Sequence, residues 1–266
     1  MSKMPLGKDV KQPRGHDPSV LYPITRRPCP ILVYGYDFWR SYELSWLNKK
    51  GKPEVGILEL AYPRESECIV ESKSLKLYLN GLSQAAFDSA EEVKNTIQQD
   101  LERILIPPWI FVRIIDQKRF SELLCEPQMP GVCLDLLDLS IDIYQRDPAL
   151  LSCHKGLQEE TLSSDLLRTS CPITGQPDWA SVVISYRGRR IDHSSLLKYL
   201  CSYRDYAGFA EEVCEQIFLD IFEKCSPETL SVRCFYTRRG GIDITPHRLS
   251  EPTGPEDIER TRLIRQ

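Results

Sequence analysis

The sequence predicts an α+β protein built from two copies of one unit, in which two strands, two helices and two further strands follow one another. Two pairs of similar segments predict this duplication. Residues 74–79 (SLKLYL) resemble residues 195–200 (SLLKYL), and the letters AEEV occur at 90–93 and again at 210–213. Both pairs are separated by about 120 residues, and two matches at nearly one spacing within the same order of elements indicate an internal repeat.

The first half begins with a lead-in, an aromatic cluster and a hairpin. Residues 1–30 are rich in Pro, Gly and charge, which predicts an extended lead-in. Residues 44–47 and 56–60 flank turn residues at 48–51 and therefore predict a β-hairpin. The aromatic cluster is expected to pack in the core, with a flat-ring pocket as the alternative. Its members are Tyr34, Tyr36, Phe38, Trp39, Tyr42 and Trp46.

Residues 71–82 fit two kinds of element. Leucines at every second position are typical of a strand, whereas the matching stretch at 192–203 has helical spacing. Because the repeat requires the same element at both places, we favour a helix.

The remainder of the first half predicts a helix, two strands and a linker. A capping-box spacing at 88–91 precedes apolar residues on one helical face, which predicts an amphipathic helix over 88–105. Strands are predicted over 109–115 and 132–144. Residues 145–169 include Pro148 and Gly156 and have weak periodicity, so they are predicted to be a linker.

The second half follows the same plan. Residues 180–186 predict a strand that ends at 187–189. Apolar residues recur with helical spacing from 209 to 221 and predict a helix. Residues 230–236 alternate as a strand, and a turn at 238–241 leads into another strand at 242–244.

Composition limits the classes of partner. The chain has 266 residues, enough for one large domain or two ordinary ones, and a net charge of -4 argues against a general nucleic-acid-binding protein. No apolar run approaches the roughly 20 residues that span a bilayer. The N-terminal residues lack the apolar core of a secretory signal, so we expect a cytoplasmic protein with no membrane or direct nucleic-acid partner.

Ten cysteines are scattered along the chain without a C-x-x-C pair. This pattern favours reduced core residues over a disulfide framework. Cys153 and His154 are adjacent, but no second ligand pair stands at a matching spacing, so no metal site is predicted.

Cys171 and Asp178 form the most informative pair in the sequence. They lie seven residues apart, and the Pro and Gly residues between them can fold the backbone back on itself. A thiolate can add to an unsaturated carbon, while a carboxyl group of raised pKa can protonate the heteroatom. The alternative is a half-buried cysteine in a turn followed by a turn aspartate, and spacing alone does not exclude it.

Two segments are candidate sites for phosphate. Residues 71–74 (ESKS) combine an acid, two hydroxyls and a cation, either as an ordinary helix start or as an anion site at a helix N-terminus. Residues 238–241 (RRGG) offer guanidinium groups beside glycines, either as a solvated hairpin tip or as a phosphate site. Neither a Rossmann nor a P-loop motif is present.

Glu211 is an acid in a predicted helix. Most such residues are solvated, but a buried one facing a ligand can accept paired N–H donors from a purine-like edge. Periodicity does not decide between these interpretations.

Three motifs, in the expected order, resemble one enzyme family. They are ESKSLKLY at 71–78, CPITGQPDW at 171–179 and YTRRGG at 236–241. Together they resemble the NADPH-dependent 7-cyano-7-deazaguanine reductases of queuosine biosynthesis, and the similarity covers nearly the whole chain. The separation of the first motif from the thiol is similar to the long, two-module form of this family.

The resemblance implies two tandem tunnelling-fold (T-fold) units, residues 1–150 and 151–266, with an antiparallel sheet and helices on one face. It also implies reduction of a nitrile to a primary amine with two NADPH, and a deazapurine as the small-molecule substrate. Since the motifs lie in different halves, the site is expected between modules or between subunits, and a homodimer is expected.

The resemblance further implies a role for each matching residue. Cys171 would form a thioimide with the nitrile carbon, and Asp178 would donate the proton. Val70, Glu71, Ser72 and Glu211 would bind the substrate. Ser72, Lys73, Arg239 and Gly240 would bind NADPH.

One position departs from the family pattern, because Ala210 stands where the family usually has a histidine before the glutamate. The loss of an imidazole is expected to affect substrate orientation or proton handling. Three alternatives therefore remain beside the reductase, namely a deazapurine-binding protein without turnover, a zinc cyclohydrolase of the same fold and an ammonia-adding amidine-forming enzyme.

Overall fold

The computed structural model describes residues 12–123 and 125–266 of the chain. The first half contains β1 (Pro23–Thr25), β2 (Tyr34–Leu47), β3 (Pro53–Pro63), β4 (Cys68–Val70), α1 (Ser72–Leu82), α2 (Ala90–Leu105) and β5 (Phe111–Asp116). Short strands β6 (Cys125–Glu126) and β7 (Val132–Cys133) follow. The second half contains β8 (Cys153–Ser170), β9 (Pro177–Ile191), α3 (His193–Ser202), α4 (Ala210–Cys225), β10 (Thr229–Tyr236), β11 (Ile242–Leu249) and β12 (Arg262–Leu263).

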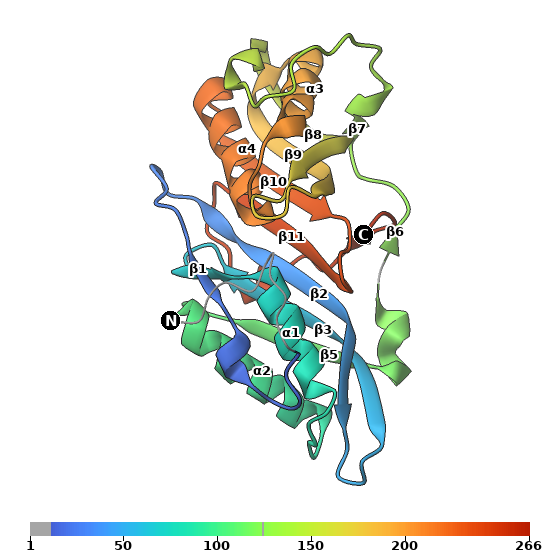
Figure 1. Cartoon of the computed structure of the whole chain (residues 1–266). Helices are drawn as coiled ribbons and strands as arrows, with labels where there is room; N and C mark the ends of the chain where they lie inside the picture. Colours follow the sequence, from blue (N-terminus) through green and yellow to red (C-terminus); the bar gives the residue numbers. More distant parts are fainter. Residues whose placement is uncertain (1–11, 124) are drawn as a thin grey trace.

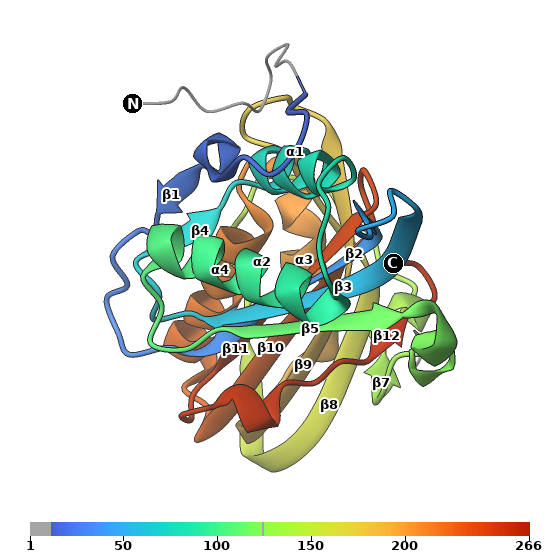
Figure 2. The ribbon, with the colours of Figure 1, turned by 90° about the horizontal axis from the view of Figure 1, so that it is seen from below.

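One eight-stranded sheet runs through both halves, in the order β5-β3-β2-β11-β10-β9-β8-β7. All its neighbours are antiparallel except β7 and β8. The halves join where β11 pairs with β2, from Ile242 opposite Ser41 to Leu249 opposite Tyr34. Figures 1 and 2 show α1, α2, α3 and α4 against one face of this sheet, which confirms an α+β fold with a large, mostly antiparallel sheet.

Two hydrophobic cores lie between the sheet and the helices. One contains residues of α1, α2, β2 and β3, and the other contains residues of α3, α4, β9 and β10. The predicted helix over 71–82 is confirmed by α1, whose Leu75, Tyr78 and Leu79 are buried. The hairpin is also confirmed, since Leu44 pairs with Gly56 and Leu47 with Pro53.

The internal repeat is visible in the hydrogen bonds as well as in the order of elements. The Tyr78 hydroxyl donates to Asp100 at 2.7 Å in the first half, and the Tyr199 hydroxyl donates to Asp220 at 2.6 Å in the second. Each bond ties the first helix of a pair to the second. The same buried polar contact therefore occurs at equivalent places in both halves.

The predicted linker over 145–169 is wrong, because most of it belongs to β8, the longest strand. Its first residues are exposed and its pairing with β9 is irregular between Cys153 and Leu157 and again between Ser164 and Leu167. A strand with exposed residues and register shifts, whose outer side pairs only with the two residues of β7, has no regular apolar alternation, and the sequence pattern therefore gave no strand signal.

The predicted strand over 132–144 is also wrong beyond its first two residues. Val132 and Cys133 form β7, and a short 3-10 helix (Leu134–Leu136) follows. Leu136 is 87% exposed, so its alternation with the other leucines does not reflect a buried sheet face. The first half consequently supplies three long strands to the sheet, where the second supplies four.

Smaller differences concern where elements begin and end. The helix predicted over 88–105 begins at Ala90, because Ser89 is its N-cap and accepts the Glu92 N–H. β9 continues past the predicted end at 187–189 and ends at Ile191. Gly188 is therefore a strand residue and not a turn residue, and a Cβ there would lie 2.8 Å from the Pro227 Cα, so close packing against Pro227 requires the glycine.

The predicted lead-in over 1–30 lies partly outside the described residues. Its remainder forms a 3-10 turn (Pro18–Val20) and β1, which pairs with β4. The aromatic cluster lies on β2 and is mostly buried, as the core prediction required, with Tyr36, Phe38 and Trp46 almost fully enclosed.

A candidate active site between the two halves

A cavity of about 370 Å³ lies where the two halves of the sheet meet. This volume is within the range of small-molecule sites. Its lining includes every site residue that the family resemblance implied, together with others from both halves. The implied residues are Val70, Glu71, Ser72, Lys73, Cys171, Asp178, Glu211, Arg239 and Gly240.

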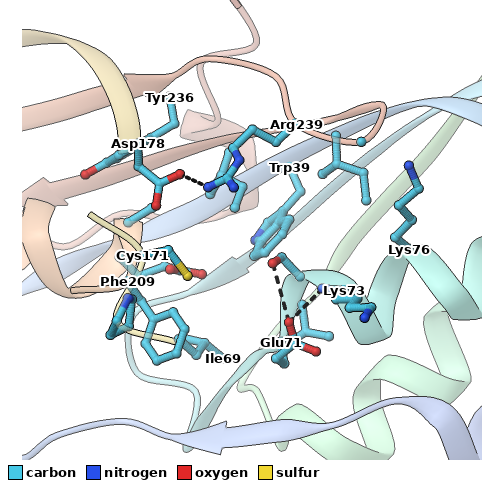
Figure 3. Close-up of a pocket in the computed structure, with 18 of the residues that line it drawn as sticks. Trp39, Ile69, Glu71, Lys73, Lys76, Cys171, Asp178, Phe209, Tyr236 and Arg239 are labelled. Carbon is cyan, nitrogen blue, oxygen red and sulfur yellow. Dashed lines mark hydrogen bonds and ion pairs between the residues drawn. The ribbon is translucent and has the colours of Figure 1, made fainter. Parts of the chain in front are cut away.

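The nucleophile candidate lies in a closed turn between β8 and β9. The Cys171 N–H donates to the Gln176 carbonyl at 2.8 Å, and the Gly175 N–H donates to the Cys171 carbonyl at 2.9 Å. Gly175 has φ +68°, a conformation that favours glycine. Cys171 is 9% exposed, and Figure 3 shows its sulfur directed into the cavity.

Asp178 lines the same cavity at the start of β9. Burial raises the pKa of Asp178, while the neighbouring Arg239 guanidinium lowers it. The net shift is upward, the direction that a proton donor requires near neutral pH. The structure thus brings together the thiol and the carboxyl group that the sequence had only placed seven residues apart.

Glu71 caps α1, so the helix-start interpretation of this motif holds for the glutamate itself. Its carboxylate accepts the Lys73 N–H at 2.7 Å and the Ser74 N–H at 2.8 Å, as Figure 3 shows in part. Burial raises the pKa of Glu71, and these hydrogen bonds lower it. Asp192 caps α3 in the same way, but only Glu71 lines the cavity.

Cationic side chains approach the cavity from two walls. Lys73 and Lys76 lie on α1, one helical turn apart, and Arg239 comes from the turn between β10 and β11. Arg239 forms an ion pair with Asp178 and a hydrogen bond to Gln176. Gly240 has φ +58°, and a Cβ there would lie 2.7 Å from the Lys76 Nζ.

These groups fit the phosphates of a dinucleotide. Lysine and arginine side chains bind phosphate as point charges and as forked donors, respectively. Gly240 has no side chain, whereas a Cβ at this position would contact the Lys76 ammonium group. The glycine therefore keeps space for an anion beside Lys76. Ser72, in the first turn of α1, adds a hydroxyl on the same wall.

Glu211 lies in the first turn of α4 and is only 4% exposed, so the solvated interpretation is wrong. Burial, followed by repulsion from Asp37, raises the pKa of Glu211 to about 8. Arg26 and Arg248 lower it but are themselves paired with Asp37, at 2.5 and 2.8 Å. A ligand that donates N–H groups would stabilise the charged carboxylate.

Sequence reasoning did not single out several cavity residues. Lys76 had a signal, because it follows Lys73 by three residues in a predicted helix, the spacing of one helical face. Gln176 and Phe209 had none, since each role depends on how the turns fold. Ala210 lines the cavity beside Glu211 with only a methyl group.

Neither a metal-ligand cluster nor a membrane-spanning helix is found in the part of the chain that the structure describes. In residues 12–123 and 125–266, no three His, Cys, Asp or Glu side chains gather in a way that could hold a metal ion. Within the same residues, every helix is too short or too polar to cross a membrane. The ten cysteines are all free thiols.

Two family models match this chain. One family model, described as the N-terminal part of the nitrile reductase 7-cyano-7-deazaguanine reductase, matches residues 14–108, and another, described as a QueF-like protein, matches residues 177–253. A solved structure of the archaeosine synthase QueF-Like in the apo form has 17% identity and a TM-score of 0.33, covering 38% of this chain and 99% of that chain.

Two curated relatives are much more similar. A Burkholderia ambifaria protein named NADPH-dependent 7-cyano-7-deazaguanine reductase is 44% identical over 267 residues, which cover 97% of each chain. A Bordetella parapertussis protein of the same name is 42% identical over 272 residues, covering 98% of this chain and 99% of the relative. With this identity along nearly their full length, the chain belongs to the family of NADPH-dependent 7-cyano-7-deazaguanine reductases.

Proposed function

We infer that this chain reduces the nitrile of 7-cyano-7-deazaguanine to the aminomethyl group of 7-aminomethyl-7-deazaguanine, with NADPH as reductant, in the biosynthesis of queuosine. Its membership of the reductase family supports this activity. The observation that carries the mechanism is the meeting of Cys171 and Asp178 in one cavity with the cations of α1 and Arg239.

Cys171 acts as the nucleophile. Its thiolate attacks the nitrile carbon, a carbon–sulfur bond forms, and one π bond of the nitrile becomes a lone pair on nitrogen. Asp178 gives its proton to that nitrogen, and the product of this step is a thioimide with no atom lost. A buried carboxyl group of raised pKa holds this proton better than an exposed one.

Glu211, Glu71, Val70 and Ser72 hold the deazaguanine ring. The pyrimidine edge of the substrate presents N–H donors, and the Glu211 carboxylate accepts a pair of them. Glu71 still has lone pairs beside its two cap bonds and faces the same cavity. The acidic groups therefore orient the ring while the thiol faces the nitrile.

Ser72, Lys73, Arg239 and Gly240 bind NADPH, and we add Lys76. When bound, NADPH supplies the two hydrides of the four-electron reduction. For the phosphates, the chain contributes the lysines of α1 on one wall of the cavity, and Arg239 and Gly240 of the β10–β11 turn on the other. The cavity itself holds the reacting ring.

The fold supports two tandem T-fold units, which we place at residues 1–150 and 151–266. The equivalent Tyr–Asp bonds and the two separate family matches support this division. The site forms between the two halves of one chain. Among the described residues, β5 lies at the edge of the sheet and pairs with β3 alone, which supports a homodimer formed through this free edge. Sedimentation of the purified protein tests it.

Turnover is the test of the proposed function. With excess NADPH, the purified chain is expected to oxidise two molecules of NADPH for each molecule of nitrile, and mass spectrometry should detect the amine. A protein that binds the deazapurine without turnover would bind the nitrile but leave the NADPH absorbance unchanged. That outcome would mean that the chain, with Ala210 in place of the usual histidine, binds the deazapurine but does not reduce it.

Removing Lys76 is expected to weaken cofactor binding selectively. Lys76→Ala should raise the KM for NADPH about tenfold, the effect of losing one charge-assisted contact, because its ammonium group lines the mouth of the cavity. Adduct formation with the nitrile in the absence of NADPH should stay at the wild-type rate. Lys94→Ala, on the exposed face of α2 and paired with Glu91, is the matched control. Equal KM values for both variants would contradict the assignment.

A further inference from the structure

Arg239 holds the turn that carries the nucleophile. Its guanidinium contacts the Asp178 carboxylate with one arm and the Gln176 side-chain carbonyl with the other. Gln176 also accepts the Cys171 N–H through its backbone carbonyl, so both contacts fix the same turn. Figure 3 shows Arg239 beside Asp178 at one wall of the cavity, with Lys73 and Lys76 on the facing side.

We propose that Arg239 is a movable clamp whose guanidinium leaves Asp178 and Gln176 when the phosphates of the dinucleotide enter, so that cofactor binding releases Asp178 to carry the proton. The clamp rests on the proposed function, and it gives Arg239 and Gln176 a role in proton transfer in addition to phosphate binding.

The side chain can move without the backbone. Arg239 N–H and carbonyl both bond to Ile242, at 2.9 and 3.2 Å, which anchors the main chain of the turn. The Arg239 side chain is 43% exposed, so it can swing away from Asp178 into solvent without displacing packed side chains. A doubly charged phosphate competes well for a guanidinium that is now paired with one carboxylate, and the lysines of α1 already draw an anion to that place.

Several charged and titratable groups face Asp178, and Arg239 is the cation in direct contact with it. On β8, Thr169 lies opposite Asp178, and its hydroxyl donates to the Asp178 backbone carbonyl at 3.5 Å, while the neighbouring Arg168 pairs with Asp205. The other groups are the Tyr236 phenol from β10, the Cys171 thiol from the β8–β9 turn, Glu211 from α4, and Lys73 and Lys76 across the cavity.

Departure of Arg239 favours the protonated form of Asp178. In the empty cavity Arg239 opposes the upward effect of burial on the pKa of this carboxyl group. Without that cation, a larger fraction of Asp178 holds a proton at pH 7, and the addition of Cys171 to the nitrile is correspondingly faster. Sulfur–carbon bond formation and proton transfer from Asp178 to nitrogen balance the step, and no reductant takes part in it.

The rate of thioimide formation without reductant tests the clamp. The nitrile is mixed with the full chain from pH 5 to 9, with and without 2′-phosphoadenosine diphosphate ribose, which has the cofactor's phosphates but no nicotinamide ring. In the wild type this probe is expected to speed adduct formation at pH 7 about tenfold, because a larger share of Asp178 then holds the proton that the step requires. Arg239→Gln should be about tenfold faster without the probe and unaffected by saturating probe.

Arg238→Gln is the control, because Arg238 stacks on the Tyr42 ring at 4.3 Å and does not line the cavity. It should respond to the probe as the wild type does. A wild-type rate that is the same with and without bound probe would overturn the clamp, as would an Arg239→Gln variant that forms the adduct more slowly than wild type. No adduct under any condition would instead overturn the proposed function.

Discussion

Replacing Cys171 with alanine is expected to abolish both the covalent adduct and turnover. In the wild type, mixing with 7-cyano-7-deazaguanine without NADPH should increase the protein mass by one intact substrate, because addition to a nitrile expels nothing. The alanine variant has no nucleophile, and kcat should fall about 10⁴-fold or more, as when other covalent catalysts lose their nucleophile. Intact-mass spectrometry and the NADPH assay measure the two effects.

Two further variants make the result specific to this thiol. Cys171→Ser keeps the shape of the turn but offers a far weaker nucleophile, and it should also form no adduct. Cys201→Ala removes a half-buried thiol of α3 that packs against the second core and does not line the cavity. It should bind one substrate covalently, as the wild type does. An adduct on Cys171→Ala would show that another group is the nucleophile.

The sequence predicted the elements whose pattern is local and failed where the pattern depends on the whole sheet. α1 was assigned correctly because its counterpart α3 removed the ambiguity of its leucines. β8 was missed because its pairing with β9 is irregular and its first half is exposed, so the sequence has no apolar alternation there. Leu136 and Leu137, which follow β7, gave the sequence an apolar pattern typical of a strand, but both are exposed.

The site could be predicted as a set of residues only through the family motifs. The sequence spacing placed Cys171 and Asp178 at the two ends of one turn, but nothing local indicated that α1 of the other half would close the same cavity. Burial of Glu211 was equally beyond sequence periodicity, because it depends on Asp37, Arg26 and Arg248 meeting behind α4. Asp37 and Arg248 meet because β2 pairs with β11 at the junction between the halves, and Arg26 reaches Asp37 from the residue after β1.

Glu211→Gln is expected to stabilise the empty protein while it weakens substrate binding. The carboxyl group of Glu211 holds its proton to a pKa of about 8 in the folded chain, against 4.5 when unfolded. Since the unfolded chain releases this proton first, wild-type stability falls as pH rises from 4.5 to about 8. The amide removes a cost on the order of a few kcal/mol, so the Tm of the variant should exceed that of the wild type increasingly over this pH range.

Substrate binding changes in the opposite direction. Only the charged carboxylate accepts two N–H donors, so wild-type affinity for the nitrile should improve as pH rises towards 8 and then level off. In Glu211→Gln the amide NH2 group faces one of the substrate N–H donors, so one hydrogen bond is lost. The kcat/KM of the variant should fall about 10²-fold and lose this pH dependence. Glu212→Gln is the matched control, because Glu212 pairs with the exposed Arg27 at 3.1 Å and lies outside the cavity. If both variants have wild-type Tm and affinity profiles from pH 5 to 9, Glu211 does not hold the substrate. A stability gain joined to a loss of binding would instead mean that the empty fold keeps a buried carboxyl group at the expense of stability, because the ligand requires its charge.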